Sequence, residues 1–479
     1  MAQKPEKLDR GVLTIALVLV TGGLAVIFDT TIVSVALHTL AVDLHASVGV
    51  IQWVSTGYLL ALGVTIPVVG WAQARFGGKR VWMFALAVFL VASIAASLAW
   101  DAQSLIAFRV LQGIGGGLMM PLMATLVMQA AGGKSLGRLM AVVSLPAALG
   151  PILAPALGGI ILNWLDWRWL FWVNVPFCLV GLVLAWRFLP ADGPRTRARL
   201  DVLGLVLLSP ALVGILYGLS NVGKDGGFTR ADVLVPALAG VVLLAVFLVR
   251  AGRRPADALV DVALLRRRAV GSSSLVLFLS GASLYGSMLL LPLYFQNVRG
   301  TDALAAGLLL VPQGIGTLLS RTLAGRLTDS IGARWVTIAG FAVTGLATIP
   351  FALADAHTGI WWLMAVMLVR GVGLGAVMIP VMSVAFVGLD RSEMPHASII
   401  TRLAQQLGGS FGTAILAVIL ETAVAGASGP AAVAFAFDQA FWWAIGFTVV
   451  AIAVSFALPA RAAQPPAPAP AAPTERVEA

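Results

Sequence analysis

The sequence predicts an all-α polytopic membrane protein, and three observations carry that prediction. Hydrophobic residues make up 59% of the chain and charged residues only 11%, against about 25% charged in soluble domains. The mean hydropathy is +0.96 over 479 residues. Fourteen stretches are also apolar over the roughly 20 residues that a helix needs to cross the hydrocarbon of a bilayer.

Those stretches give the expected order of the chain, which begins with a short basic segment that lacks a small-residue cleavage site and is therefore not a signal peptide. We expect spans at 12–38, 49–71, 80–100, 104–127, 138–162, 167–189, 200–221, 232–250, 269–293, 304–325, 334–353, 360–386, 397–422 and 439–459.

The distribution of Lys and Arg predicts the orientation. With the N-terminus inside, 23 of the 31 basic residues fall in inner segments, and only Arg168, Lys224, Arg230 and Arg299 fall outside. This excess predicts a multi-pass protein of the cell membrane with both termini cytoplasmic. It also explains the net charge of +10, so we expect no nucleic-acid partner.

The sequence offers no metal or cofactor site. Cys178 is the only cysteine, and the four histidines are scattered without ligand spacing. No GxxxxGK[ST] loop for a nucleotide is present. We therefore expect no cofactor and no enzymatic activity, because no cluster of acid, base and nucleophile residues appears at a membrane face.

Asp29 is the most informative single residue, because it stands in the apolar run "LAVIFDTTIVSVAL" of the first span. A charge at the bilayer centre costs about 2.5–3.5 kcal/mol on insertion scales and usually faces an interior with a function. Its helical face also carries Gly22, Ala25 and Ala36, whose small side chains favour close helix packing. We expect Asp29 to carry protons; the alternative is a carboxylate that snorkels to the headgroups.

Two halves of the chain resemble each other. "GWAQARFGGKR" (70–80) recurs as "GRLTDSIGARW" (325–335), "QGIGGG" (112–117) as "RGVGLG" (370–375), and "LPAALGP" (145–151) as "LAQQLGG" (403–409). The expected domains are a six-helix half (1–190), two inserted helices (191–250), a basic cytoplasmic loop (251–268), a second six-helix half (269–460) and a disordered Pro/Ala-rich tail (461–479).

Four of these stretches resemble the major facilitator superfamily, specifically its fourteen-helix drug:proton antiporter branch. They are "FDTTIVSVAL" (28–37), "GWAQARFGGKR", "LIAFRVLQGIGGG" (105–117) and "LGPILAPALGG" (149–159). The resemblance implies that fold and proton-coupled export of small amphipathic compounds, as in antibiotic resistance. Two positions depart from the family pattern: Ala74 replaces the loop aspartate, whose second copy is Asp329, and His38 replaces a proline.

The motifs supply the candidate site residues. Arg109 needs a partner in the membrane, and we expect it to favour the ionised state of Asp29; the alternative is a structural bond to carbonyls. Gln112 shares its face, and with Arg370 and Arg402 it is a candidate cavity residue, whereas Arg321 snorkels inward.

Two further groups concern helix shape and gating. Gly150, Pro151, Pro155, Gly158 and Gly159 predict a bend in the fifth span, which the resemblance links to exchange; simple packing is the alternative. The candidates for gating are the cytoplasmic loop residues Gly70, Arg75, Gly77, Lys79, Arg80, Asp329 and Arg334, and the alternative for the basic ones is positive-inside charge.

The predicted function is therefore a proton-coupled antiporter, acting as a monomer in the lipid bilayer of a bacterial inner membrane, with protons and a small organic substrate as partners. The alternative on the same fold is a dedicated transporter of one metabolite. A membrane enzyme or sensor is the third class, and the sequence lacks the clustered groups that it needs.

Overall fold

The structure is a computed structural model that describes residues 10–46, 48–131, 139, 157–193, 199–221, 230–253, 258–301, 303–355, 357–390, 392–425 and 429–459. These residues form helices and no strand, as predicted. The major helices are α1 (Arg10–Val35), α3 (Val48–Thr65), α5 (Gly78–Ser97), α6 (Ala102–Ala131), α10 (Asn174–Phe188), α11 (Val202–Ser220), α12 (Ala231–Arg253), α13 (Arg268–Asn297), α15 (Val311–Ile331), α16 (Ala333–Thr348), α17 (Ile360–Ala385), α18 (Met394–Ala425) and α19 (Pro430–Ser455).

Shorter helices connect or extend them. They are α2 (Leu37–Asp43), η1 (Ile66–Val68), α4 (Val69–Phe76), α9 (Trp169–Trp172), η4 (Val262–Arg266), α14 (Ala303–Leu309) and η5 (Ile349–Leu353). Within the described residues, twelve helical stretches are long and apolar enough to cross a membrane.

Two of the fourteen expected spans, 138–162 and 304–325, are not among these twelve stretches. Most of 138–162 lies outside the described residues. The span 304–325 corresponds to α14 and α15, and α15 is less apolar than the other long helices because it contains Arg321, Arg326 and Asp329. The count of fourteen therefore stays a prediction.

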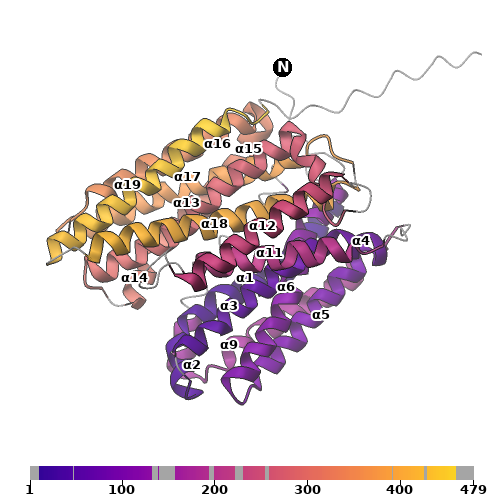
Figure 1. Cartoon of the computed structure of the whole chain (residues 1–479), viewed down its shortest axis with the longest axis horizontal. Coiled ribbons are helices and arrows are strands. Elements are labelled where there is room, and N and C mark those ends of the chain that lie inside the picture. Colours follow the sequence, from indigo (N-terminus) through magenta and orange to yellow (C-terminus); the bar gives the residue numbers. More distant parts are fainter. Residues whose placement is uncertain are drawn as a thin grey trace, which may run out of the picture.

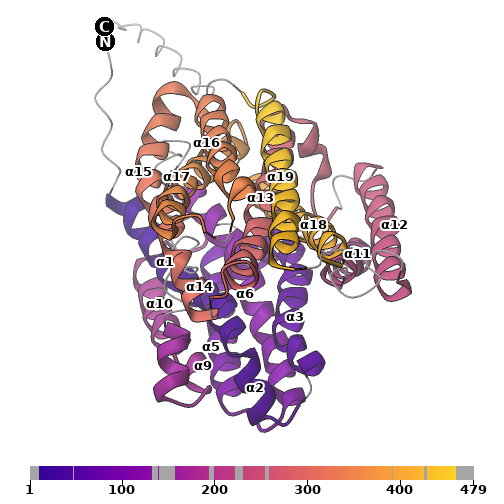
Figure 2. The same ribbon diagram turned by 90° about the vertical axis from the view of Figure 1, so that its left-hand side faces the viewer.

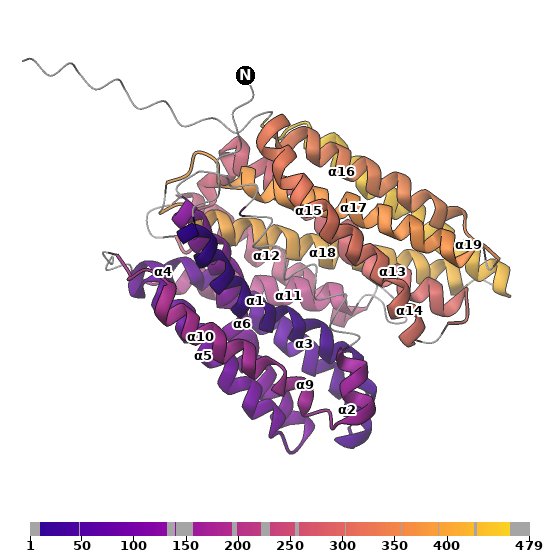
Figure 3. The same cartoon turned by 180° about the vertical axis from the view of Figure 1, so that it is seen from behind.

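The helices form two groups, one from the N-terminal part of the chain and one from the C-terminal part. Helices α1, α3, α5, α6 and α10 pack on one another, and α13 and α15–α19 pack into a second group. The two groups meet at the end that carries α4 and diverge toward the ends that carry α2 and α14 (Figures 1 and 3).

Close contacts hold the groups together at the α4 end. The hydroxyl of Ser398 on α18 donates to the carbonyl of Pro121 on α6 at 2.9 Å. Gly70 on α4 packs on α18, where a Cβ atom at Gly70 would lie 3.5 Å from Ile399 and 3.6 Å from Pro395. Buried apolar residues of both groups therefore form one continuous core here.

Helices α11 and α12 pair with each other at the edge of the molecule (Figure 2). α11 contacts α3 of the first group and α18 of the second. Only 17% of the apolar window of α12 is buried, so this helix presents most of its apolar surface outward. The Arg250 guanidinium on α12 makes two hydrogen bonds, of 2.7 and 2.8 Å, to the Asp201 carboxylate that caps α11.

Candidate functional site

The centre of the first helix group is a buried polar cluster around Asp29. The side chains of Asp29 on α1 and Arg109 on α6 are 0% and 1% exposed, and they form an ion pair. The amide nitrogens of Gln112 and Asn174 each donate to Asp29 Oδ1 at 2.9 Å. The carboxylate therefore faces the interior of the group, where three hydrogen-bond donors satisfy it.

Arg109 is fixed from several sides. Its Nε donates to the carbonyl of Val54 on α3 at 3.1 Å, and its Nη1 donates to Gln112 Oε1 at 2.6 Å. Its Cζ atom lies 4.1 Å from the centre of the Tyr58 ring, a distance that suits a cation–π contact. Ser93 on α5 completes the cluster by accepting from Gln112 at 2.7 Å.

Glycines on α6 allow this cluster to form. A Cβ atom at Gly113 would collide with the backbone carbonyl of Tyr58, and one at Gly117 would lie 2.6 Å from the carbonyl of Leu62. Both positions face α3, so α6 approaches that helix at backbone distance and brings Arg109 within reach of Val54. The glycine-rich run of α6 therefore permits close packing of this helix on α3.

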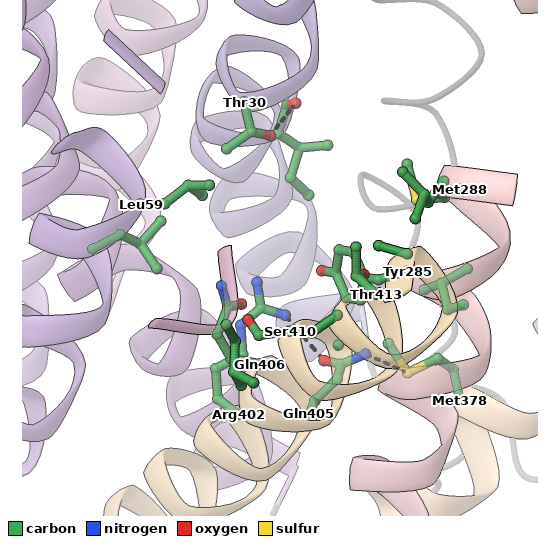
Figure 4. Close-up of a pocket in the computed structure, with 18 of the residues that line it drawn as sticks. Thr30, Leu59, Tyr285, Met288, Met378, Arg402, Gln405, Gln406, Ser410 and Thr413 are labelled. Carbon is green, nitrogen blue, oxygen red and sulfur yellow. Dashed lines mark hydrogen bonds between the residues drawn. The ribbon is translucent and has the colours of Figure 1, made fainter. Parts of the chain in front are cut away.

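A separate cavity of about 1170 Å³ lies between the two helix groups. Its wall comes from α1, α3 and α6 on one side and from α13, α17, α18 and α19 on the other. Figure 4 shows Thr30 and Leu59 from the first group opposite Tyr285, Met288 and the polar side chains of α18. Asp29 does not line this cavity, although its neighbour Thr30 does.

Of the three candidate cavity residues, only Arg402 lines the cavity. The prediction is wrong for Gln112, which is fully buried against Asp29. It is also wrong for Arg370, which is 1% exposed and donates to Thr348 at 3.1 Å, to Gln313 at 2.5 Å and to Ser287. Both residues point into the interior of their own helix group, because the faces of α6 and α17 that carry them contact neighbouring helices.

Arg321 on α15 does not extend to the aqueous face, so the prediction that it snorkels is wrong. Its side chain is 6% exposed, and its Nε and Nη1 atoms have no hydrogen-bond partner among the described residues. A guanidinium that reached the aqueous face would be exposed, so the guanidinium is inside the second helix group.

Two of the basic loop residues, Lys79 and Arg334, bind helix ends within their own group. Lys79 Nζ donates to the carbonyls of Trp186 and Leu189, at 2.7 and 2.8 Å, at the C-terminal end of α10. Arg334, its counterpart in the repeat, donates from Nε to the carbonyl of Leu458 beyond α19 at 2.8 Å. Cations stabilise helix C-termini, so this pair of contacts has a structural role in addition to any role in gating.

The remaining loop residues lie at the same end of the two helix groups. Gly77 and Gly332 both have φ +95, a conformation that favours glycine at the turn into α5 and α16. Arg75, Arg80 and Asp329 are exposed. Gly70 and Ser398 contribute direct contacts between the two groups at this end.

The bend predicted in the fifth span falls largely outside the described residues, which include neither Gly150, Pro151 nor Pro155. Gly158 and Gly159 lie in the described helical stretch 157–164, where Gly158 is buried and Gly159 is half-buried. The bend therefore stays a prediction.

Sequence reasoning missed several residues of these sites. Asn174, Ser93 and Tyr58 complete the Asp29 cluster, and their only signal was a polar group within an apolar span. Asp192 was also missed: its carboxylate accepts the backbone N–H of Lys79 at 2.8 Å and of Arg80 at 3.3 Å. It supplies an acidic cap at the loop where Ala74 replaces the expected aspartate.

Comparison with known proteins agrees with this architecture. Residues 19–413 match the Major Facilitator Superfamily. The multidrug resistance protein B homolog of Mycobacterium tuberculosis is 37% identical over 87% of this chain and 77% of that protein. The tetracenomycin C resistance and export protein of Streptomyces glaucescens is 31% identical over 85% and 76%. A double Trp mutant of XylE has a similar fold, with a TM-score of 0.69 at 16% identity over 95% of this chain and 97% of that one.

Proposed function

Because the chain belongs to the Major Facilitator Superfamily, we propose that this multi-pass membrane transporter exports small amphipathic organic compounds in exchange for protons. The names of its relatives, which refer to multidrug resistance and to export, support efflux rather than uptake. The breadth of those names and the size of the cavity favour several substrates over a single metabolite.

The observation that carries proton coupling is the buried Asp29–Arg109 pair. A buried carboxylate is stable as an anion only while a cation and hydrogen-bond donors compensate its charge. When a proton neutralises Asp29, Arg109 loses its ionic partner and retains Val54, Gln112 and Tyr58. Protonation therefore changes the forces between α1, α3 and α6, three helices that also line the cavity.

The contacts between the two helix groups at the α4 end support a proposal for the direction of the described state. We propose that the α4 end is cytoplasmic, together with both termini, in agreement with the excess of inner Lys and Arg. The two helix groups then act as halves joined by α11 and α12, in an arrangement that is closed toward the cytoplasm by Gly70 and Ser398. A proton that enters from outside and a substrate that leaves there alternate with the opposite, inward-open arrangement.

The test uses the purified protein in proteoliposomes that contain a pH-sensitive dye. An imposed gradient of a fluorescent amphipathic compound drives proton movement in the wild type, and we expect Asp29→Asn to abolish it. Asp43→Asn on α2, an exposed carboxylate, is the matched control and retains coupling. A folded Asp29→Asn protein that still moves protons at the wild-type rate would disprove the assignment.

A further inference from the structure

The second helix group contains buried arginines that no nearby carboxylate neutralises among the described residues. Arg321 and Arg370 are 6% and 1% exposed, and Arg402 lines the cavity. The described carboxylates of α13 and α15–α19 lie elsewhere along their helices, at Asp329, Glu421 and Asp438. In contrast, the Asp29–Arg109 pair leaves the first group without net charge at its centre.

Arg402 presents this positive charge to the cavity. Its Nη1 donates to Gln405 Oε1 at 3.2 Å, and its Nε is buried without a hydrogen-bond partner among the described residues. None of the described ion pairs includes it. Glu421 also lines the cavity, but nineteen residues further along α18, which at 1.5 Å per residue is about 28 Å away. This separation exceeds the roughly 8 Å Debye length of physiological salt.

The surroundings of Arg402 are amphipathic. Gln405, Gln406, Ser410 and Thr413 follow it on the cavity side of α18 and supply neutral hydrogen-bonding groups (Figure 4). Met288, Met378 and Met382 line the cavity as well. Unbranched thioether side chains adapt to varied apolar shapes and contact aromatic rings favourably.

We infer that the compounds transported best are amphipathic organic anions, with the acidic group on Arg402 and the apolar body among the methionines. A guanidinium binds a carboxylate or sulfonate through two parallel hydrogen bonds. A lipophilic cation in the same place would meet Arg402 without a compensating acid among the described residues that line the cavity near it. This inference deepens the proposed function and rests on it, since it names the substrate class for that transporter.

The experiment compares two fluorescent probes that share one skeleton. Anilinonaphthalene sulfonate is a monoanion, and phenylnaphthylamine lacks the sulfonate and is neutral. Equilibrium binding to the protein in nanodiscs gives a dissociation constant for each, after subtraction of empty nanodiscs. In Arg402→Gln we expect the sulfonate to bind at least about 10-fold more weakly and the neutral probe to change by less than about 2-fold.

Two further variants make the result specific. Arg402→Lys keeps the charge but loses the planar guanidinium that makes two parallel hydrogen bonds, so we expect intermediate sulfonate affinity. Arg253→Gln removes an exposed arginine at the end of α12 and leaves both affinities unchanged. Equal weakening of both probes by Arg402→Gln, or no weakening of either, would overturn the inference, as would loss of sulfonate binding in Arg253→Gln.

The outcome is separate from that of the proton-coupling test. Equilibrium binding needs no proton movement, so charge discrimination at Arg402 survives if Asp29 proves not to couple. Conversely, coupled export of a probe whose affinity is independent of Arg402 would retain the proposed function and refute only the substrate class.

Discussion

Replacing Asp29 by Asn leaves the Arg109 guanidinium buried without its ionic partner, whereas replacing both residues removes the charge from the cluster. Removing one partner of a buried pair costs about 3–5 kcal/mol of stability. Arg109 retains the Val54 carbonyl, Gln112 and the Tyr58 ring, so we expect Asp29→Asn to cost about 3 kcal/mol, at the lower end of that range. In Arg109→Gln, Asp29 retains two amide donors, and we expect a similar cost.

The double variant Asp29→Asn/Arg109→Gln should lose no more than either single variant, because no unpaired charge remains buried. That result corresponds to an interaction energy of about 3 kcal/mol, the upper part of the range for residues in contact. The assay is reversible unfolding in mixed micelles, titrated with a denaturing detergent and followed by tryptophan fluorescence. The control cycle uses Asp166 and Arg168, a surface pair 49% and 43% exposed, which should show a much smaller interaction. Additive losses at the buried pair would refute the reasoning.

Two other variants test how helix ends and helix contacts are held. Asp192→Ala removes the acidic cap from α5 and should lower stability by about 1 kcal/mol, measured as a lower melting temperature, while the exposed Asp43→Ala should leave it unchanged. Gly408→Ala places a methyl group against the carbonyl of Phe278 where α18 meets α13, an overpacking that costs about 1–3 kcal/mol. Gly446→Ala meets nothing within 4 Å and should be neutral or slightly stabilising, so equal effects of the two glycine variants would contradict the packing argument.

Composition and motifs were sufficient to predict the helical membrane fold and to single out Asp29 and Arg109, because a charge within an apolar span is rare and costly. They were not sufficient for the partners of those residues. Asn174 and Ser93 are polar groups of a kind that many spans contain. Only the packing of the helices shows that Asn174 donates to Asp29 and that Ser93 accepts from Asn174.

The rotation of each helix about its axis was the main unknown. α17 is apolar on all sides, so its periodicity does not indicate which face turns inward. The sequence therefore predicts Arg370 in the cavity, whereas its guanidinium donates to Thr348 and Gln313. Asp192 was missed for a different reason: its carboxylate reaches a loop more than a hundred residues earlier in the chain, and local sequence does not specify such a contact.

The separation of charge between the two helix groups has an energetic consequence for transport. Among the described residues, Asp29 is the one acid at the centre of the first group, so one proton per cycle is the simplest stoichiometry for the proposed exchange. Exchange of that proton for a monovalent cation moves no net charge, and exchange for a neutral compound moves one, which gains about 2.3 kcal/mol per 100 mV. Exchange for a monovalent anion moves two net charges, which gains about 4.6 kcal/mol per 100 mV of membrane potential. The pH gradient adds about 1.4 kcal/mol per pH unit in each case. A cavity that selects anions through Arg402 therefore draws the most work from the membrane potential, and clamping the potential in vesicles at fixed pH should affect sulfonate export more strongly than export of the neutral probe.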